Sequence, residues 1–188
     1  MTDVNLKIAV SGDLGSGKST VCKLLLQKLP EFRIYSMGEA WRKLAEDRKM
    51  TILELNRYSE THPLDEEMDE AMARMGKAPE PIIFDSRLGW YFVPHSFKVH
   101  LTVDPRAAAT RIFNDHRRGD AEEYASVDEA MQKILARHQS EKQRYLKKYG
   151  IDCTDPHNYH LIIDTTHQTP EEVAEVIVDR FKVWSQEQ

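Results

Sequence analysis

Residues 8–20 restrict the folds that this chain can adopt. Residues 8–10 form a short apolar run, and residues 12–19 match the pattern G-x-x-x-x-G-K-[ST]. Its glycines let backbone N–H groups turn inward around phosphate oxygens, and a helix that begins near the lysine adds its positive end. Such a loop needs a strand before it and a helix after it. The stretch therefore predicts a strand–loop–helix unit that holds the phosphates of a nucleoside triphosphate.

Further apolar runs indicate how the rest of the molecule is built. Runs at residues 6–10, 32–35, 82–84, 98–103 and 161–163 predict strands, and segments with helical spacing lie between them. Thr169 and Glu172 predict a capped helix near the end of the chain. Strands that alternate with helices form a parallel sheet covered on both faces, with ligands at the carboxyl ends of the strands. We expect an α/β protein with a P-loop NTPase fold in one domain, residues 1–188.

Composition and charge exclude several classes of partner. The chain has 188 residues, 30% of them charged, and a net charge of -5, so we expect neither nucleic-acid binding nor membrane association. No window approaches the roughly 20 apolar residues of a membrane span, and residues 1–7 lack the pattern of a secretory signal. Cys22 and Cys153 have no motif spacing, which predicts reduced thiols. These features predict a cytoplasmic protein, which we expect to be a monomer.

The glycine-rich loop is the predicted ATP-binding site. Its residues are Gly12, Asp13, Leu14, Gly15, Ser16, Gly17, Lys18, Ser19 and Thr20. We expect Lys18 to reach the β- and γ-phosphates and the Ser19 hydroxyl to bind Mg²⁺. Asp85 ends a buried run, where its carboxylate would hold Mg²⁺ through water. An aspartate that caps a turn or a helix is the alternative for Asp85.

The first stretch of the predicted acceptor site surrounds residue 36. Ser36 and Gly38 lie where a strand turns into a helix, so N–H groups and a hydroxyl face the ligand. Arg42 follows one turn later, where its guanidinium could clamp a phosphate with two hydrogen bonds. The alternative for Arg42 is a surface arginine paired with Glu39 or Glu46.

Two more stretches contribute arginines to this site. Arg87 follows Asp85 by two residues and is expected to project toward the gap between donor and acceptor. Arg137, Glu141 and Arg144 have the spacing of one stripe along a helix. We expect Glu141 to hold both arginines of the stripe where negative charge builds up during phosphoryl transfer. The alternatives are a strand-bridging role for Arg87 and an exposed salt-bridge ladder for the stripe.

Two further segments have weaker signals. Residues 63–72 are acidic at their start and predict a solvated helix face, after which Arg74 is expected to turn inward to a phosphate. Residues 112–127 lack apolar period and predict a mobile flap. A flap would keep water away from the transferring phosphate.

The motifs narrow the class of P-loop protein. GTPases need an N-K-x-D motif and a D-x-x-G motif, and neither occurs in this sequence. An ABC-type signature is also absent, and the chain is short for a motor. A small-molecule kinase remains. The alternative from another class is a nucleotide-binding sensor, which would not need arginines at a transition state.

These stretches together resemble the nucleoside monophosphate (NMP) kinases, and most closely the compact archaeal-type cytidylate kinases. The resemblance covers nearly the whole chain. It rests on GDLGSGKST at 12–20, Ser36, Gly38 and Arg42, DSRLGW at 85–90, FKVHLTVD at 97–104, RIFNDHRRG at 111–119, R-x3-E-x2-R at 137–144, RYLKKYGID at 144–152 and LIIDTT at 161–166. The P-loop alone is generic, whereas the arginine stripe followed by YGID and IDTT is far more specific.

The resemblance implies a five-stranded parallel core, a helical NMP-binding region at about residues 36–80 and a lid at about residues 112–127. It implies transfer of the γ-phosphoryl group of ATP to CMP or dCMP with Mg²⁺. By position, Arg42 and Arg87 resemble ligands of the acceptor phosphate. Arg137 and Arg144 resemble the arginines that bind acceptor and transferring phosphates. Arg111 resembles the arginine that lies against adenine.

Two departures concern the acceptor base. Leu88 stands where larger bacterial enzymes carry an aspartate that helps to read cytosine, and Ser86 replaces their usual glycine. These enzymes also have a longer inserted acceptor domain, for which this chain has no room. A related P-loop kinase that acts on another nucleotide or a cofactor precursor is therefore the nearest alternative.

Overall fold

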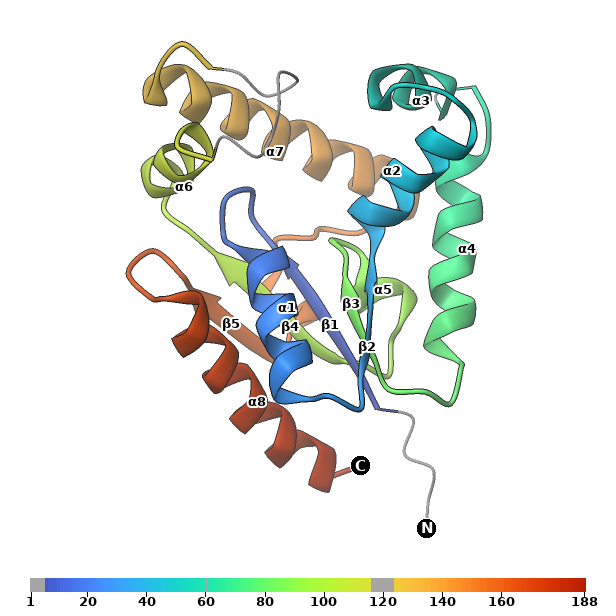
Figure 1. The fold of residues 1–188 in the computed structure, drawn as a ribbon, viewed down its shortest axis with the longest axis vertical. Coiled ribbons are helices and arrows are strands. Elements are labelled where there is room, and N and C mark those ends of the chain that lie inside the picture. The colour runs from blue at the N-terminus through green and yellow to red at the C-terminus, as the bar shows by residue number, and fades with distance from the viewer. Residues whose placement is uncertain (1–5, 60, 116–123) are drawn as a thin grey trace.

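The computed structural model describes residues 6–59, 61–115 and 124–188, in which strands and helices alternate (Figure 1). The strands are β1 (Lys7–Gly12), β2 (Arg33–Ser36), β3 (Ile82–Asp85), β4 (Phe97–Thr102) and β5 (Leu161–Asp164). The helices are α1 (Lys18–Lys28), α2 (Met37–Asp47), α3 (Ile52–Ser59), α4 (Leu64–Gly76), α5 (Gly89–Phe92), α6 (Pro105–Phe113), α7 (Val127–Tyr149), the 3₁₀ helix η3 (Pro156–Asn158) and α8 (Pro170–Gln186). Each strand matches a predicted run to within two residues.

The strands form one parallel sheet in the order β2-β3-β1-β4-β5. Val10 of β1 lies beside Asp85 of β3, and Ser36 of β2 lies on the other side of Asp85. The carboxyl ends of these strands therefore place the donor loop, Asp85 and the start of α2 next to one another. The predicted five-stranded parallel sheet flanked by helices is confirmed.

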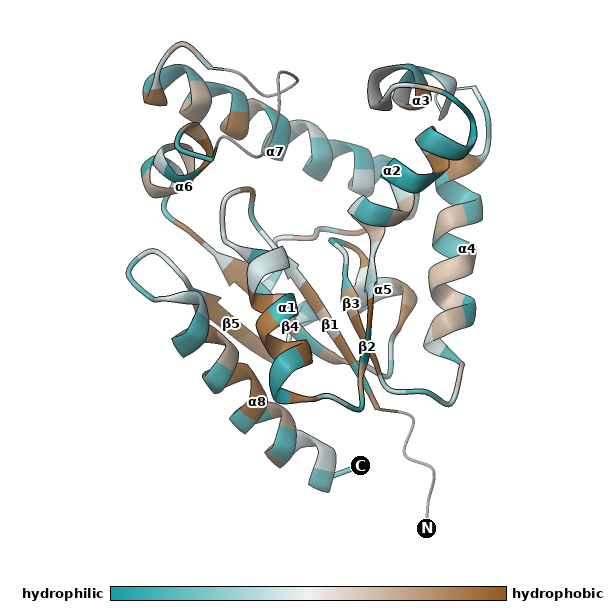
Figure 2. Cartoon of the chain, viewed as in Figure 1, coloured by the Kyte–Doolittle hydropathy of each residue, from teal (hydrophilic) through white to brown (hydrophobic). Residues whose placement is uncertain are grey.

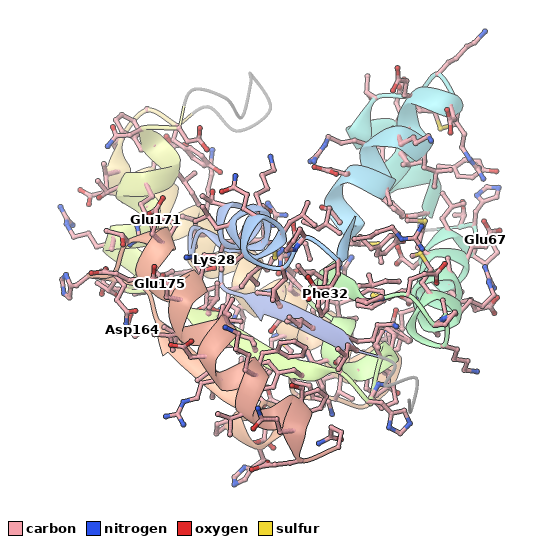
Figure 3. The ribbon with its side chains drawn as sticks, turned by 60° about the horizontal axis from the view of Figure 1, so that its bottom comes forward. Lys28, Phe32, Glu67, Asp164, Glu171 and Glu175 are labelled. Carbon is pink, nitrogen blue, oxygen red and sulfur yellow. The ribbon has the colours of Figure 1, made fainter. Side chains whose placement is uncertain are left out.

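Helices α1 and α8 cover one face of the sheet. Their inward sides are apolar and their outward sides are polar, as the hydropathy colours show (Figure 2). Phe32 packs edge-on against Phe181, with ring centroids 5.6 Å apart. At the rim, Lys28 Nζ lies 3.2 Å from Glu175 Oε1, and both residues lie where α1 and α8 run side by side (Figure 3). Burial of this apolar face is the main force that fixes both helices on the sheet.

The predicted cap of the last helix is confirmed. The Thr169 side chain accepts a hydrogen bond from the Glu172 backbone N–H, and the Glu172 carboxylate accepts from the Thr169 backbone N–H. This reciprocal pair satisfies two N–H groups that the helix itself leaves without partners.

Helices α4 and α5 cover the opposite face, together with the segment between α7 and β5. Met72 of α4 and Trp90 of α5 pack with Ala9 and Phe84 of the sheet. The Tyr159 ring completes this layer, with its centroid 5.6 Å from that of Trp90. Helix α7 passes across the carboxyl end of the sheet, above the donor loop (Figure 1). The predicted site therefore lies between the sheet and α7.

Helices α2, α3 and α4 form the region that the resemblance assigns to the acceptor. They share a small apolar cluster built on Ala45, Leu55 and Leu64. The limits of this region at residues 36–80 and of the lid at residues 112–127 remain predictions, and residues 116–123 lie outside the described residues. Across the described parts of the chain, we find no helix with the length and apolar character needed to span a membrane.

Candidate active site

The donor loop joins β1 to α1 through backbone conformations that require glycine. Gly15 and Gly17 have φ angles of +79° and +83°, in the left-handed region. A Cβ atom at Gly12 would lie 2.8 Å from the Leu101 carbonyl oxygen. Among the described residues, no side chain caps the start of α1, and its first turn holds no acidic residue. The N–H groups and positive end of α1 are therefore left to an anion.

Asp85 contacts residues of both the donor loop and the predicted acceptor site. Its carboxylate is only 3% exposed and forms an ion pair with Lys18. Its Oδ2 accepts hydrogen bonds from Ser19 Oγ at 2.8 Å and from Ser36 Oγ at 3.3 Å. Asp85 thus faces the loop as predicted, whereas the cap of the following helix is Leu88.

Lys18 retains its charge in this buried setting. Burial lowers the pKa of Lys18 to about 8, which leaves the ammonium as the main form at pH 7. The carboxylate of Asp85 is its partner in the described chain. Because phosphate oxygens carry more negative charge than one carboxylate, a triphosphate in the loop would compete for this ammonium.

The acceptor-side residues lie at the start of α2. Ser36 caps this helix by accepting a hydrogen bond from the Glu39 N–H at 3.4 Å, while its hydroxyl donates to Asp85. A Cβ atom at Gly38 would lie 3.6 Å from Arg42 Nη1, so the guanidinium lies over the first turn of the helix. With the described residues Arg42 forms no ion pair, and the predicted alternative of a pair with Glu39 or Glu46 is not observed. Arg42 therefore remains available to an anion.

Glu141 joins α7 to the end of β3. Its Oε1 forms an ion pair with Arg87 and lies 3.1 Å from Arg137 Nε, and its side chain is 13% exposed. The sequence prediction paired Glu141 with both Arg137 and Arg144. In the described structure Glu141 forms ion pairs with Arg87 and Arg137 and none with Arg144, although its charge is among those that raise the pKa of Arg144. The stripe thus differs from an isolated surface ladder, since its acid also contacts Arg87, which lies in the loop that follows β3.

The two remaining predicted arginines of the acceptor site, Arg144 and Arg74, form no ion pair with Glu141 in the described structure. The Arg144 guanidinium lies over the Tyr145 ring, 5.3 Å from its centroid, on the same helix as Arg137. Arg74 Nη1 lies 3.5 Å from Glu70 Oε2, and its side chain is 69% exposed. The structure therefore groups Arg87 with Arg137 and does not bring Arg74 to them. The predicted phosphate-binding role of Arg74 remains untested.

Arg111 fixes the donor loop to the end of β5. Its Nη1 donates to the Gly15 carbonyl at 3.2 Å and to Thr165 Oγ1 at 3.2 Å. Its Nη2 donates to the carbonyl oxygens of Thr165 at 2.6 Å and Thr166 at 3.1 Å. Arg111 therefore lies beside the donor loop and holds two loops together, and its place against adenine stays a prediction.

Comparison with known proteins identifies the family to which the chain belongs. Residues 7–167 match the model of the cytidylate kinase-like family. The chain belongs to this family. It is 35% identical to the cytidylate kinase of Thermoplasma volcanium over 97% of this chain and 95% of that protein. It is 33% identical to the cytidylate kinase of Methanobrevibacter smithii over 94% of this chain and 98% of that protein.

Another relative carries a cytidylate kinase-like segment within a longer chain. An S-adenosylmethionine-dependent nucleotide dehydratase of Lacinutrix mariniflava is 34% identical over 94% of this chain but only 36% of its own length. Among solved structures, the shikimate kinase of Bacteroides thetaiotaomicron superposes with a TM-score of 0.63 at 16% identity, over 94% of this chain and 98% of that chain. The shikimate kinase of Aquifex aeolicus gives 0.60 at 15% identity, over 94% and 96%. At these identities the likeness supports the P-loop kinase fold alone.

Behind the donor loop lies a pocket that the sequence did not reveal. It is lined by Ser11, Gly12, Asp13, Leu14, Arg87, His100, His138, Glu141, Tyr145, Cys153, Thr154 and Tyr159. Asp13 Oδ1 lies 3.8 Å from His100 Nε2 and 4.0 Å from His138 Nε2. Burial lowers the pKa of His100, whose Nδ1 lies 2.7 Å from Ser11 Oγ, so this ring is neutral at pH 7. Single histidines far apart in the sequence carry no spacing that could predict this cluster.

The acidic run at residues 63–72 also differs from its prediction as a solvated face. Lys148 Nζ of α7 lies 3.4 Å from Asp65 Oδ2 and 2.9 Å from Glu66 Oε1. One turn later, the Tyr149 hydroxyl donates to Asp69 Oδ2 at 2.5 Å. Part of the run thus attaches α4 to the end of α7, because α7 is a 23-residue helix that reaches α4 at its carboxyl end.

Proposed function

We propose that this protein transfers the γ-phosphoryl group of ATP to CMP or dCMP. The observation that carries the proposal is the position of Asp85. One buried carboxylate contacts Lys18 and Ser19 of the donor loop and Ser36 of the acceptor side. A phosphate bound at the loop and a phosphate bound at the start of α2 would therefore face each other across Asp85. Membership of the cytidylate kinase-like family supports cytosine as the base.

The proposed role of each residue follows from its position in the fold. The N–H groups of the loop and Lys18 would hold the β- and γ-phosphates of ATP. Arg42 and Arg87 would hold the acceptor phosphate from two sides, at the start of α2 and at the end of β3. Since the transferring group passes through a state with charge spread over its oxygens, arginines at that point lower the barrier. Arg137 and Arg144 of α7 would stabilise this charge on the transferring phosphoryl group. Glu141 would position Arg137 and Arg87.

The oxygen donors at the loop fit a magnesium ion. Ser19 Oγ and the Asp85 carboxylate lie 2.8 Å apart, and both are hard oxygen ligands of the kind that Mg²⁺ takes. When bound with ATP, the ion would neutralise phosphate charge as the terminal bond breaks. Ser19 and Asp85 would hold it, directly or through water.

Product analysis tests this function directly. Protein incubated with Mg²⁺, ATP and CMP is expected to form CDP and ADP in equal amounts, because one phosphoryl group moves for each ATP consumed. Anion-exchange chromatography of the quenched reaction separates the four nucleotides. Formation of ADP and inorganic phosphate without CDP would indicate an ATPase or a sensor and would contradict the proposal.

Arg42→Ala is expected to raise KM for CMP by roughly 10- to 100-fold, since a charge-assisted arginine–phosphate pair is worth a few kcal/mol. KM for ATP should stay nearly unchanged because Arg42 lies at the start of α2, away from the donor loop. Initial-rate kinetics with each substrate varied in turn give both constants. Lys43→Ala is the matched control, as Lys43 is the next residue of α2 and is exposed. An effect of Arg42→Ala on ATP alone would remove Arg42 from the acceptor site.

A further inference from the structure

The proposed function leaves open which group recognises the cytosine base. Leu88, which stands in the place of the base-reading aspartate of larger enzymes, is 6% exposed and has no polar side-chain atom. It is the N-cap of α5, and the first residue of that helix, Gly89, packs against the sheet. If CMP is the acceptor, a polar group from another element must therefore distinguish its base. The inference that follows rests on the proposed function.

Asp69 is a carboxylate whose second oxygen has no partner in the described structure. Its Oδ2 accepts the hydrogen bond from the Tyr149 hydroxyl at 2.5 Å. To the described residues, Oδ1 makes no hydrogen bond, and Asp69 forms no ion pair with them. The nearby Lys148 ammonium binds Asp65 and Glu66 instead. Asp69 is thus fixed at one oxygen and open at the other.

This carboxylate lies beside the proposed acceptor site. Asp69 is close enough to Tyr35, the residue before Ser36, for its charge to raise the pKa of the tyrosine, although burial contributes more. The Tyr149 ring lies 6.0 Å from Tyr91 and 5.5 Å from Phe92, both in the helix that follows Leu88. Asp69 therefore lies near Tyr35 of β2 and, through Tyr149, near α5. The proposed acceptor ligands flank these segments, since α2 with Arg42 follows β2 directly and Arg87 lies two residues before α5. Figure 1 shows α4 and α5 on that side of the sheet, with the end of α7 beside them.

The surroundings of Asp69 disfavour the charged form of its carboxyl group. The carboxyl group is half-buried, and this burial raises the pKa of Asp69 despite the hydrogen bond from Tyr149. Burial raises the pKa of Tyr149 as well, so its hydroxyl keeps its proton and remains a donor. A half-buried carboxylate without an ion pair is unfavourable for stability, which is typical of a group retained for binding.

We propose that Asp69 determines the base specificity of the acceptor site, with Oδ1 accepting a hydrogen bond from the exocyclic amino group of cytosine. Tyr149 is the positioning residue, because its hydroxyl fixes the carboxylate through Oδ2. Carboxylates are suited to the cytosine amino group, which donates two hydrogens. Uracil carries an oxygen in the same place, and two oxygens without a hydrogen between them repel each other. The pair would therefore favour CMP and dCMP over UMP.

The variant Asp69→Asn tests this specificity. An asparagine amide offers one oxygen and one NH₂ group, so by turning over it can pair with either base. The ratio of kcat/KM for CMP to kcat/KM for UMP is expected to fall by roughly 10- to 100-fold, the range expected for one base-reading contact. Much of this change should be a gain with UMP. Asp69→Glu keeps the carboxylate and should keep the preference for CMP.

Two further variants separate recognition from a structural role. Tyr149→Phe keeps the ring contacts and removes the hydroxyl, so it should lower the same ratio by less than Asp69→Asn does. Glu67→Gln is the matched control, because Glu67 is an exposed acid on the outer side of α4, where Figure 3 shows it pointing away from the molecule. That change should leave the ratio as in the wild-type protein. If Asp69→Asn fails to fold, Tyr149→Phe provides the same comparison.

A structural role for Asp69 predicts a different result. If Asp69 only attaches α4 to α7, Asp69→Asn should lower the midpoint of thermal unfolding and reduce kcat/KM for CMP and UMP by the same factor. An unchanged ratio would overturn the inference, whether or not both rates fall. Wild-type protein that phosphorylates neither CMP nor UMP would instead contradict the proposed function itself.

Discussion

Replacing Lys18 with alanine is expected to lower kcat by about 10²-fold or more, the effect of removing one preorganised electrostatic group from a transition state. The reason is that negative charge moves onto the β–γ bridge as it breaks, and Lys18 is the positively charged side chain of the loop that would meet it there. The chain should still fold, because Ser19 and Ser36 donate to the Asp85 carboxylate, but the unfolding midpoint should fall, since Asp85 is 3% exposed and loses its ion-pair partner. Single-turnover kinetics and thermal unfolding measure the two effects separately.

Lys23→Ala is the matched control for this experiment. Lys23 lies on the same helix and is exposed, so its removal should leave kcat unchanged. If Lys18→Ala retained near-normal turnover with an unchanged unfolding midpoint, the loop would not be the donor site.

Arg144→Ala is expected to reduce kcat by roughly 10²- to 10⁴-fold with little loss of stability, because a guanidinium at the transferring phosphate meets charge that develops only in the transition state. The structure leaves Arg144 outside the Glu141 ion pair and over the Tyr145 ring. Its removal therefore breaks no ion pair that holds α7 to the sheet. Pre-steady-state kinetics with CMP and ATP give the rate of transfer itself.

Two related variants test the geometry of this part of α7. Arg144→Lys should recover only part of the rate, since an ammonium restores the charge but not the planar two-point contact. Glu141→Gln should weaken the positions of Arg87 and Arg137 and give an intermediate rate. Lys147→Ala, an exposed change in the last turn of α7, serves as the control. Kinetics of Arg144→Ala within twofold of wild type would refute its role in transfer.

Local patterns in the sequence were sufficient to predict the frame of the site. The G-x-x-x-x-G-K-[ST] spacing and five apolar runs predicted the strands, the donor loop and the position of Asp85. The capping residues Thr169 and Glu172, which are three residues apart, predicted the start of α8. Each of these predictions depends on neighbours in the chain, whose relative positions are fixed by the backbone.

Contacts between distant segments were not predictable in the same way. The spacing of the stripe placed Arg137, Glu141 and Arg144 on one side of a helix, but it could not show that Arg87 occupies the Glu141 carboxylate. Asp69 and Tyr149 are 80 residues apart, and only the crossing of α7 to α4 brings them together. Side-chain partners across the sheet end depend on how whole helices pack, and local periodicity carries no information about that packing.

The most direct measurement is the rate of ADP release with a panel of acceptors. Protein, Mg²⁺ and ATP are combined in turn with CMP, dCMP, UMP, AMP and GMP, and kcat/KM is measured by coupling ADP to NADH oxidation. The proposed function predicts the highest values for CMP and dCMP, with UMP and both purine nucleotides lower. Failure of CMP and dCMP alongside strong turnover of another acceptor would contradict it.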